Sequence, residues 1–214
     1  MFDDFKDNQK IVYSMLKNSI KLNKISHAYL IDSNKYENIK DFINSMIKLL
    51  ICPFGYSNRN NCGQCIRCDR IENGNDTEVR HIYPDGLTIK KEQLMELQEN
   101  FNLSSIEGNR RVYVIWDCEK MNVQASNSIL KFLEEPVSNI IAILVTSNVD
   151  ALLSTIVSRC QYIKLNNYNM YSADSLVNVE RYLSEEIKGK KLWGDLDVSM
   201  EEYEILRTKN KRII

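Results

Sequence analysis

Residues 111–136 read RVYVIWDCEKMNVQASNSILKFLEEP, and this stretch decides the class of fold. Its first part, Arg111 to Trp116, is an almost continuous apolar run that ends on Asp117, which is typical of a strand buried on both faces. A helix is predicted from about Val123 to Glu135, because Pro136 cannot continue it. A buried strand followed by a helix is the repeating unit of a parallel sheet with helices on both faces.

The same alternation recurs on both sides of this stretch, so the sequence predicts an α/β fold. Apolar periodicity predicts helices over residues 9–22, 36–51 and 89–101, and apolar runs predict buried strands over residues 27–31 and 140–145. Further strands are predicted over residues 78–83, before the turn at 84–86, and over residues 162–165. Ligands of such sheets bind beyond the carboxyl ends of the strands, which are therefore the places to search for a site.

The composition is that of an ordinary globular protein. Of the 214 residues, 43% are hydrophobic and 27% are charged, and 28 basic against 29 acidic residues give a formal net charge of −1. A protein that coats DNA by itself is usually strongly basic, so this balance argues against that class. Residues 1–5 lack the order of a signal peptide, and no run of about 18 apolar residues would span a membrane. We therefore expect a cytoplasmic protein.

Four of the six cysteines follow one another closely, as Cys52-x9-Cys62-x2-Cys65-x2-Cys68. Disulfides rarely persist in a reducing cytosol, where such a cluster more often binds a metal. Four thiolates suit tetrahedral zinc and leave no open position for water, so the site would be structural. Residues 52–75 are polar and show no helical or strand period, and a metal would stabilise such a loop. Buried or reactive thiols and an iron–sulfur cluster are the alternatives.

The connection between the first predicted strand and its helix lies where a phosphate-binding loop would sit. It runs from Asp32 to Lys40 as DSNKYENIK and contains neither a glycine nor the Lys-Ser/Thr pair that binds phosphate and magnesium. Asp32 and Glu37 would also place negative charge beside a polyphosphate. We interpret the loop as a degenerate Walker A segment that binds no ATP, with Lys35 and Lys40 as solvated surface lysines.

The apolar strand that ends on Asp117 resembles a magnesium-binding Walker B segment. An active ATPase usually has a second acid directly after the first, to polarise the attacking water. That place is taken by Cys118, and Glu119 lies one residue further on. The alternative is that Asp117 caps the helix that follows.

Three further segments carry a resemblance to a known family. They are SHAYLI at 26–31, QASNSILKFLEEP at 124–136 and TIVSRCQ at 155–161. In this order, and together with the four cysteines, they resemble the bacterial DNA polymerase III clamp-loader family, and within it the delta-prime type. The resemblance covers about residues 5–165.

This resemblance implies an AAA+ module of the P-loop type, with a five-stranded parallel sheet flanked by helices and a four-Cys zinc insert. It also implies that Ser158, Arg159 and Cys160 present Arg159 as an arginine finger to the ATP of a neighbouring subunit. Such a guanidinium stabilises the charge that spreads over the transferring phosphoryl group. Residues 146–148 match the family's polar sensor segment.

The function that the resemblance implies is that of a non-hydrolysing stator, a non-catalytic subunit of a DNA-directed DNA polymerase (nucleotidyltransferase) holoenzyme. Its expected partners are a tau/gamma-type ATPase subunit, a delta-type subunit and, through the complex, a sliding clamp and primed DNA. Structural zinc is the expected cofactor, with no ATP bound by this chain. A tau/gamma-like ATPase and a zinc-stabilised DNA-binding module are the alternatives. The first would bind nucleotide by itself, and the second would bind duplex DNA in a salt-sensitive way.

The expected domains follow the family only in part. Residues 1–165 would form the AAA+-like domain, with the zinc insert at 52–75. Apolar residues are sparse and charges dense in residues 166–214, which would form a partial helical lid or tail. The family continues into a helical collar domain that holds the subunits together, and a full collar is not expected within this sequence.

Overall fold

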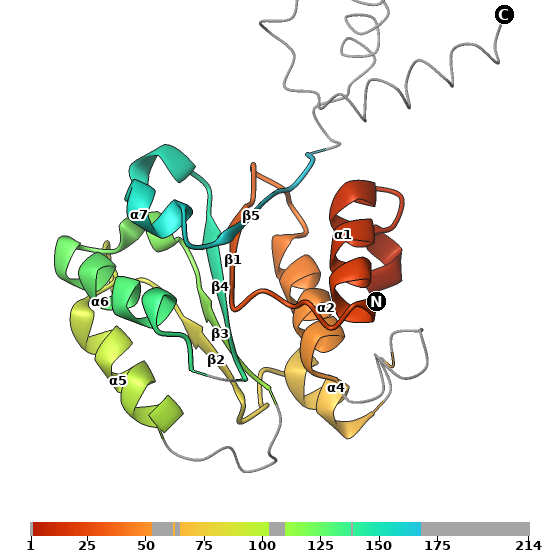
Figure 1. Cartoon of the computed structure of the whole chain (residues 1–214), viewed down its shortest axis with the longest axis horizontal. Coiled ribbons are helices and arrows are strands. Elements are labelled where there is room, and N and C mark those ends of the chain that lie inside the picture. Colours follow the sequence, from red (N-terminus) through yellow and green to blue (C-terminus); the bar gives the residue numbers. More distant parts are fainter. Residues whose placement is uncertain (1, 53–61, 63–64, 103–109, 138, 168–214) are drawn as a thin grey trace, which may run out of the picture. The chain divides into compact units, whose positions relative to one another are not determined.

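A computed structural model describes residues 2–52, 62, 65–102, 110–137 and 139–167. They form a parallel sheet of five strands in the order β2-β3-β4-β1-β5, with helices on both faces (Figure 1). The predicted α/β class and the parallel sheet are confirmed. The predicted lid or tail lies outside the described residues from position 168 onward. In the part of the chain that is described, no helix is long and apolar enough to cross a membrane.

The elements follow one another along the chain in this order: η1 (Phe2–Phe5), α1 (Lys10–Lys21), β1 (Ala28–Asp32), α2 (Ile39–Ile51), α4 (Ile66–Glu72), β2 (Val79–Ile82), α5 (Lys91–Asn102), β3 (Arg111–Ile115), η2 (Cys118–Lys120), α6 (Val123–Glu134), β4 (Ile140–Thr146), η3 (Val149–Ala151), α7 (Ser154–Val157) and β5 (Gln161–Lys164).

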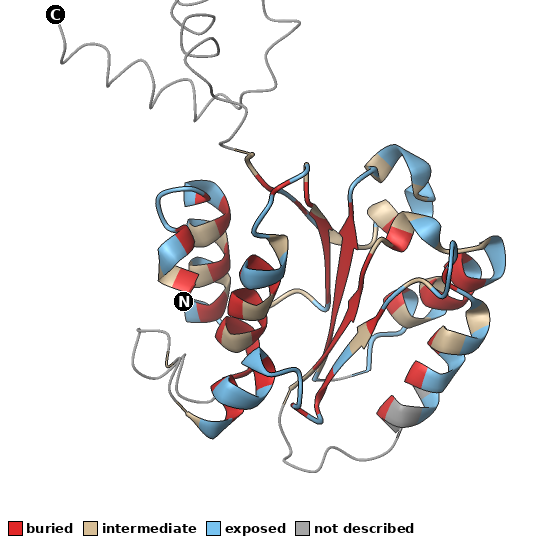
Figure 2. Ribbon diagram, turned by 180° about the vertical axis from the view of Figure 1, so that it is seen from behind, coloured by how far each residue is buried: buried red, intermediate tan, exposed pale blue. Residues whose placement is uncertain are grey.

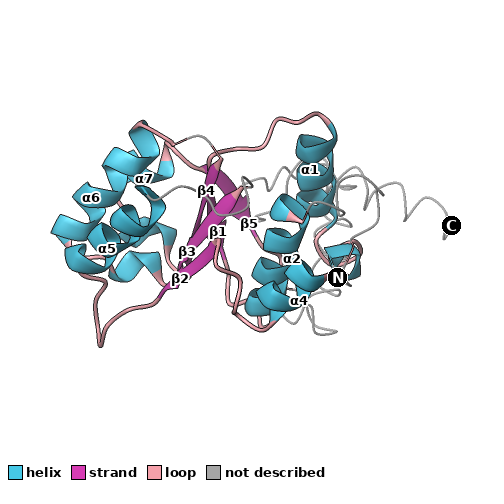
Figure 3. Ribbon diagram, turned by 90° about the horizontal axis from the view of Figure 1, so that it is seen from below, coloured by secondary structure: helices cyan, strands magenta, loops and turns pink. Residues whose placement is uncertain are grey.

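Both faces of the sheet are buried, because successive side chains of each central strand point to opposite faces. In β4, Ile141, Ile143 and Val145 pack with α1 and α2, whereas Ala142 and Leu144 pack with α5 and α6. Figure 3 shows the three layers, with α1, α2 and α4 on one side of the sheet and α5, α6 and α7 on the other. The central strands β1, β3 and β4 are buried along nearly their whole length (Figure 2). This double burial explains why the strands read as apolar runs rather than as alternating patterns.

The structure corrects the sequence-based boundaries at two places that matter for function. Residues 52–75 were expected to lack regular structure, but α4 forms within them, and the Cys65 side chain accepts a hydrogen bond from Cys68 N at its start. The helix predicted from Tyr36 begins only at Ile39. The reason is local, because Asn38, with φ −92° and ψ 32°, is not helical and stands as the N-cap residue before Ile39.

The register of the sheet brings three strand ends together. Asp32, the last residue of β1, pairs with Thr146 of β4 on one side and with Lys164 of β5 on the other. The loop at 33–38, which follows β1, therefore lies at the carboxyl edge of the sheet between the ends of β4 and β5. That edge is where ligands of parallel sheets bind.

Candidate functional site

The four cysteines predicted to bind a metal lie together in the structure. The sulfur atoms of Cys52, Cys62, Cys65 and Cys68 are all within 4.8 Å of one another. Cys52 Sγ and Cys65 Sγ are 3.7 Å apart, close to the roughly 3.8 Å edge of a tetrahedron with Zn–S bonds of about 2.3 Å. Four sulfur donors, two of them buried, suit a structural metal ion and leave no position for a substrate.

The electrostatics of this cluster favour a thiolate at Cys65. Burial raises the pKa of the Cys65 thiol, but hydrogen bonds from Cys68 N and from the neighbouring thiols outweigh burial and lower it to about 7. Burial raises the pKa of Cys68, and the adjacent thiols raise it further. The lowered pKa of Cys65 and the raised pKa of Cys68 both reflect four ionisable sulfur atoms packed around one centre. A cation at that centre would offset the repulsion between neighbouring thiolates, because all four would bind it.

Arg67 lies between Cys65 and Cys68 and joins this cluster to the sheet. This role was not predicted from the sequence. Its Nη1 donates to Ile51 O at 3.3 Å and its Nη2 donates to Arg110 O at 3.2 Å. Its Nε lies 3.4 Å from Asp76 Oδ2, and both side chains are more than nine-tenths buried. The end of α2, the start of β3 and the cysteine cluster are therefore held by one guanidinium. A charged residue inside a Cys-x2-Cys spacer was the only signal for this role.

The loop at 33–38 is closed by its own hydrogen bonds. Asp32 Oδ1 accepts from Asn34 N at 3.0 Å, and Asp32 Oδ2 accepts from Tyr162 OH at 2.9 Å. Ser33 N donates to Thr146 O at 2.8 Å, and Tyr36 N donates to Ser33 O at 2.6 Å. A phosphate-binding loop needs backbone N–H groups that point at its ligand. Here three of those groups are used within the chain, and a carboxylate occupies the turn.

Contacts with distant parts of the sequence also hold the loop at 33–38 in place. Tyr36 is 8% exposed and packs in the core beneath α1 and α2. Gln9 is fully buried and exchanges two hydrogen bonds with Asn166, at 2.8 Å and 2.9 Å. Asn34 Nδ2 donates to Leu165 O at 3.3 Å. A bulky, buried tyrosine thus stands in a loop where a nucleotide site would need glycines and open space.

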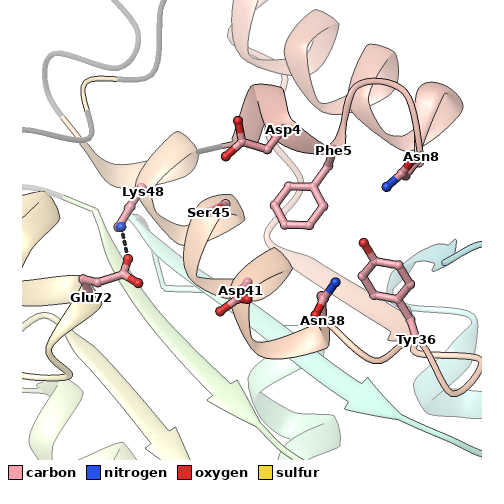
Figure 4. Close-up of a pocket in the computed structure, with 9 residues that line it drawn as sticks. All are labelled: Asp4, Phe5, Asn8, Tyr36, Asn38, Asp41, Ser45, Lys48 and Glu72. Carbon is pink, nitrogen blue, oxygen red and sulfur yellow. Dashed lines mark hydrogen bonds and ion pairs between the residues drawn. The ribbon is translucent and has the colours of Figure 1, made fainter.

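The pocket beside this loop is acidic. It has a volume of about 490 Å³ and lies among η1, α2 and α4 (Figure 4). Asp4, Asp41 and Glu72 line it, and Lys48, the one basic residue among the described residues of the lining, is paired with Glu72. Three carboxylates against one lysine repel a polyphosphate.

Asp117, the acid of the Walker-B-like segment, lies beyond the end of its strand. β3 ends at Ile115, and Asp117 adopts a left-handed conformation two residues later. Its carboxylate pairs with Lys120 at 2.9 Å and makes no capping hydrogen bond to η2, so the capping alternative is not supported. The residue that directly follows β3 is Trp116, which is buried and donates from Nε1 to His81 Nδ1 at 3.1 Å.

The polar segment after β4 also bonds within the chain. Ser147 donates from its backbone N and from its Oγ to Glu119 Oε1, at 3.3 Å and 2.7 Å. Asn148 N donates to Thr146 Oγ1 at 3.0 Å. The contacts of Ser147 join the segment after β4 to η2, the short helix after β3.

Arg159 lies between α7 and β5 and keeps about a third of its side chain exposed. Its Nη1 donates to Thr155 O at 2.9 Å, and its Nη2 forms an ion pair with Glu134 Oε1 at 2.8 Å. Ser158 Oγ donates to the same Thr155 carbonyl at 3.2 Å, so Ser158 shapes the turn. Glu134 is a residue that the sequence analysis quoted in a motif but gave no role.

Arg159 and the closed loop lie apart. The acidic pocket lies on the α2 side of the sheet, whereas Arg159 follows α7, on the other side (Figure 3). Arg159 is therefore not directed at the pocket of its own chain. The five-stranded parallel sheet in the order β2-β3-β4-β1-β5, with helices on both faces, is that of an AAA+-type module of the P-loop class.

Comparison with known proteins gives the family. The family model described as "DNA polymerase III, delta subunit" matches residues 8–169, and the chain belongs to this family. The DNA polymerase III subunit delta' of Bacillus subtilis is 40% identical over 153 residues, which are 72% of this chain and 46% of the relative. The DNA polymerase III subunit gamma of Buchnera aphidicola is 32% identical over 158 residues, 73% of this chain and 43% of the relative.

A solved structure agrees in fold. A DNA polymerase III gamma subunit-related protein from Thermotoga maritima matches with a TM-score of 0.50 and 21% identity, over 71% of this chain and 45% of that one. The chain spans less than half the length of these curated relatives. The likeness confirms the predicted family and fold.

Proposed function

We propose that this chain is a delta-prime-type, non-hydrolysing subunit of a DNA polymerase III clamp loader. It supplies Arg159 to the ATP of a neighbouring tau/gamma-type subunit and so helps to load a sliding clamp onto primed DNA. One contrast carries the proposal: the loop at 33–38 is closed by hydrogen bonds of Asp32, whereas Arg159 keeps about a third of its side chain exposed. A subunit that cannot use nucleotide itself, but exposes an arginine, is suited to act on nucleotide held by a neighbour.

The chemistry assigned to Arg159 is electrostatic. In phosphoryl transfer, negative charge spreads over the oxygens of the moving phosphoryl group, and an arginine finger supplied in trans accelerates the step by about 10³- to 10⁵-fold. Ser158 and the short α7 hold the turn from which Arg159 projects. A delta-type subunit, the clamp and DNA are the further partners of the proposed assembly.

We also propose that the four-cysteine cluster binds structural zinc. The donor set supports this ion, because four sulfur ligands in a near-tetrahedral arrangement are typical of closed zinc sites. Zinc would contribute folding free energy to a segment that has little apolar surface of its own. It would take no part in ATP hydrolysis.

The test of the finger is Arg159→Ala in the loader assembled with tau/gamma-type and delta-type subunits. We expect DNA-stimulated ATP hydrolysis to fall by about 10³-fold, with assembly unchanged on gel filtration. Arg159→Lys should also lose most of the activity, because an ammonium cannot replace the planar, bidentate guanidinium. Arg80→Ala, which changes an exposed arginine on β2, serves as the control and should be neutral. A normal hydrolysis rate with Arg159→Ala would refute the assignment.

A tau/gamma-like ATPase remains the second candidate, since gamma subunits are about 30% identical to this chain. Titration of the purified chain with a fluorescent ATP analogue and Mg²⁺ separates the two. We expect no saturable binding up to millimolar nucleotide. Micromolar affinity would favour the ATPase.

A further inference from the structure

We infer that Glu134 is the positioning residue of Arg159. Its carboxylate orients the guanidinium before the phosphates of a neighbouring subunit arrive. This inference rests on the proposed function, because it concerns how the guanidinium of Arg159 is oriented and takes the role of Arg159 as an arginine finger as given. It assigns a role to the acid at the end of α6.

The geometry of the pair is specific. Glu134 Oε1 lies 2.8 Å from Arg159 Nη2, while Thr155 O accepts from Nη1 at 2.9 Å. One partner belongs to α6 and the other to α7, so the guanidinium is held from two elements. An arginine held by two acceptors in different directions has far fewer accessible rotamers than a free surface arginine.

The core fixes both ends of the pair. Leu133, which precedes Glu134, is 3% exposed, and Ile156, three residues before Arg159, is fully buried. Both belong to the same hydrophobic cluster between α6, α7 and the sheet. Arg159 N also donates to Ile156 O at 3.1 Å. The backbones of Glu134 and Arg159 are therefore placed by packing, and only the long arginine side chain needs a further restraint.

The remaining donors of Arg159 suit a phosphate. A guanidinium has five N–H groups, and Glu134 and Thr155 use two of them. Three are left, and a bidentate contact with phosphoryl oxygens needs two. The ion pair is half exposed, so it is weak enough to adjust when the phosphates bind. Glu134 can thus orient the guanidinium of Arg159 and still leave enough N–H donors for a phosphate.

Glu135 provides a natural comparison. It is the next residue, carries the same charge and is exposed, and in the described part of the chain the acid that pairs with Arg159 is Glu134. If the negative charge near Arg159 acted only through the general potential of this surface, the two acids would be nearly equivalent. If Glu134 acts through its contact, only Glu134 matters.

The experiment measures steady-state ATP hydrolysis by the assembled loader with DNA and clamp. Glu134→Ala is expected to lower kcat roughly tenfold with little change in the KM for ATP, since a misplaced catalytic group costs rate more than substrate binding. Glu134→Gln keeps an oxygen that accepts from Nη2 and should restore kcat to within about twofold of wild type. Glu135→Ala should equal wild type, and thermal melting of the free chain should not change among the three variants.

The outcomes separate this inference from the proposed function. If Arg159→Ala abolishes hydrolysis but Glu134→Ala does not reduce kcat, the finger stands and the positioning role is wrong. If Glu134→Ala increases kcat, the carboxylate restrains the arginine instead, which also overturns the inference. Equal losses in Glu134→Ala and Glu135→Ala would replace it by a charge effect. If Arg159→Ala itself is fully active, the proposed function fails first.

Discussion

Arg67 is a buried charge, and the attachment of the cysteine cluster to the rest of the fold depends on it. Arg67→Ala removes the donors to Ile51 O and Arg110 O and leaves the Asp76 carboxylate buried without its cation. Breaking a buried pair in this way is strongly destabilising. We expect a loss of about 3 kcal/mol in the free energy of unfolding, measured by urea denaturation with far-UV circular dichroism.

The exposed Arg70, on the same helix, gives the matched control for that substitution. Arg70→Ala should change the free energy of unfolding by no more than about 0.5 kcal/mol. Equal stabilities of the two variants would mean that the contacts of Arg67 contribute nothing beyond those of a surface arginine.

Tyr113 makes stability fall at alkaline pH. It is 2% exposed, and burial raises its pKa well above 10, with Cys160 adding to the shift. Above pH 10 the unfolded chain ionises this tyrosine while the folded chain does not, so the unfolded state gains stability as the pH rises. The expected loss is up to about 1.4 kcal/mol per pH unit from this group.

The variant Tyr113→Phe should therefore lose less stability between pH 9.5 and 11.5 than wild type does, as measured by urea denaturation at each pH. Tyr83 is half exposed, so its pKa lies nearer the ordinary value, and Tyr83→Phe should keep most of the wild-type loss. Parallel pH profiles for wild type and Tyr113→Phe would contradict the assignment.

At the scale of elements, α4 and the four cysteines form one unit, to which the proposed zinc ion would belong. The purified chain is expected to contain one zinc ion per chain by mass spectrometry of the metal content. Cys65→Ser should lose the metal, because it removes one of the four thiolates, while the serine oxygen can still accept from Cys68 N at the start of α4. Cys160 lies outside the cluster, and Cys160→Ser should keep the zinc. Full metal content in Cys65→Ser would show that the cluster does not need this ligand.

The sequence predicted the elements better than their ends. All five strands were predicted, and the three central ones, β1, β3 and β4, read as apolar runs because both of their faces are buried. The helix α4 was missed because its seven residues are too few to show a period, and its start depends on a cysteine that acts as a cap. The cysteine spacing predicted the cluster because its members are local in sequence.

The contacts that define the candidate site were harder to predict. Asp32 was expected to repel phosphate, but its bond to Tyr162 depends on a partner 130 residues away. The pairing of Glu134 with Arg159 likewise depends on how α6 and α7 pack, which no local pattern states. Single residues at the site were thus visible in the sequence, whereas their partners required the fold.

At the scale of the whole molecule, the packing of the described module is completed only when the chain reaches Asn166. Gln9, before α1, holds Asn166 by two hydrogen bonds, and Leu165 is fully buried. A chain ending at Asn167 should therefore unfold cooperatively, with a midpoint in urea like that of the full chain. A chain ending at Lys164 loses the buried leucine and the Gln9 contacts, and should be less stable by about 3 kcal/mol.

Comparison of these two truncations by circular dichroism and urea denaturation tests where the module ends. If the shorter form were as stable as the longer one, the contacts of Gln9 with Asn166 would be dispensable. If the longer form failed to fold, the module would need residues beyond 167.

The position of β5 in the sheet also has a consequence for synthesis on the ribosome. β1 is made early but borders β5, the last strand of the module, so it keeps an unpaired edge until residues 161–164 have left the exit tunnel. Its residues Ala28, Tyr29, Leu30 and Ile31 are all fully buried in the finished fold. An apolar strand with an open edge can pair with a neighbouring nascent chain. For this module, translation pauses before β5 emerges are therefore expected to promote aggregation, and binding of a chaperone to β1 in that interval should suppress it.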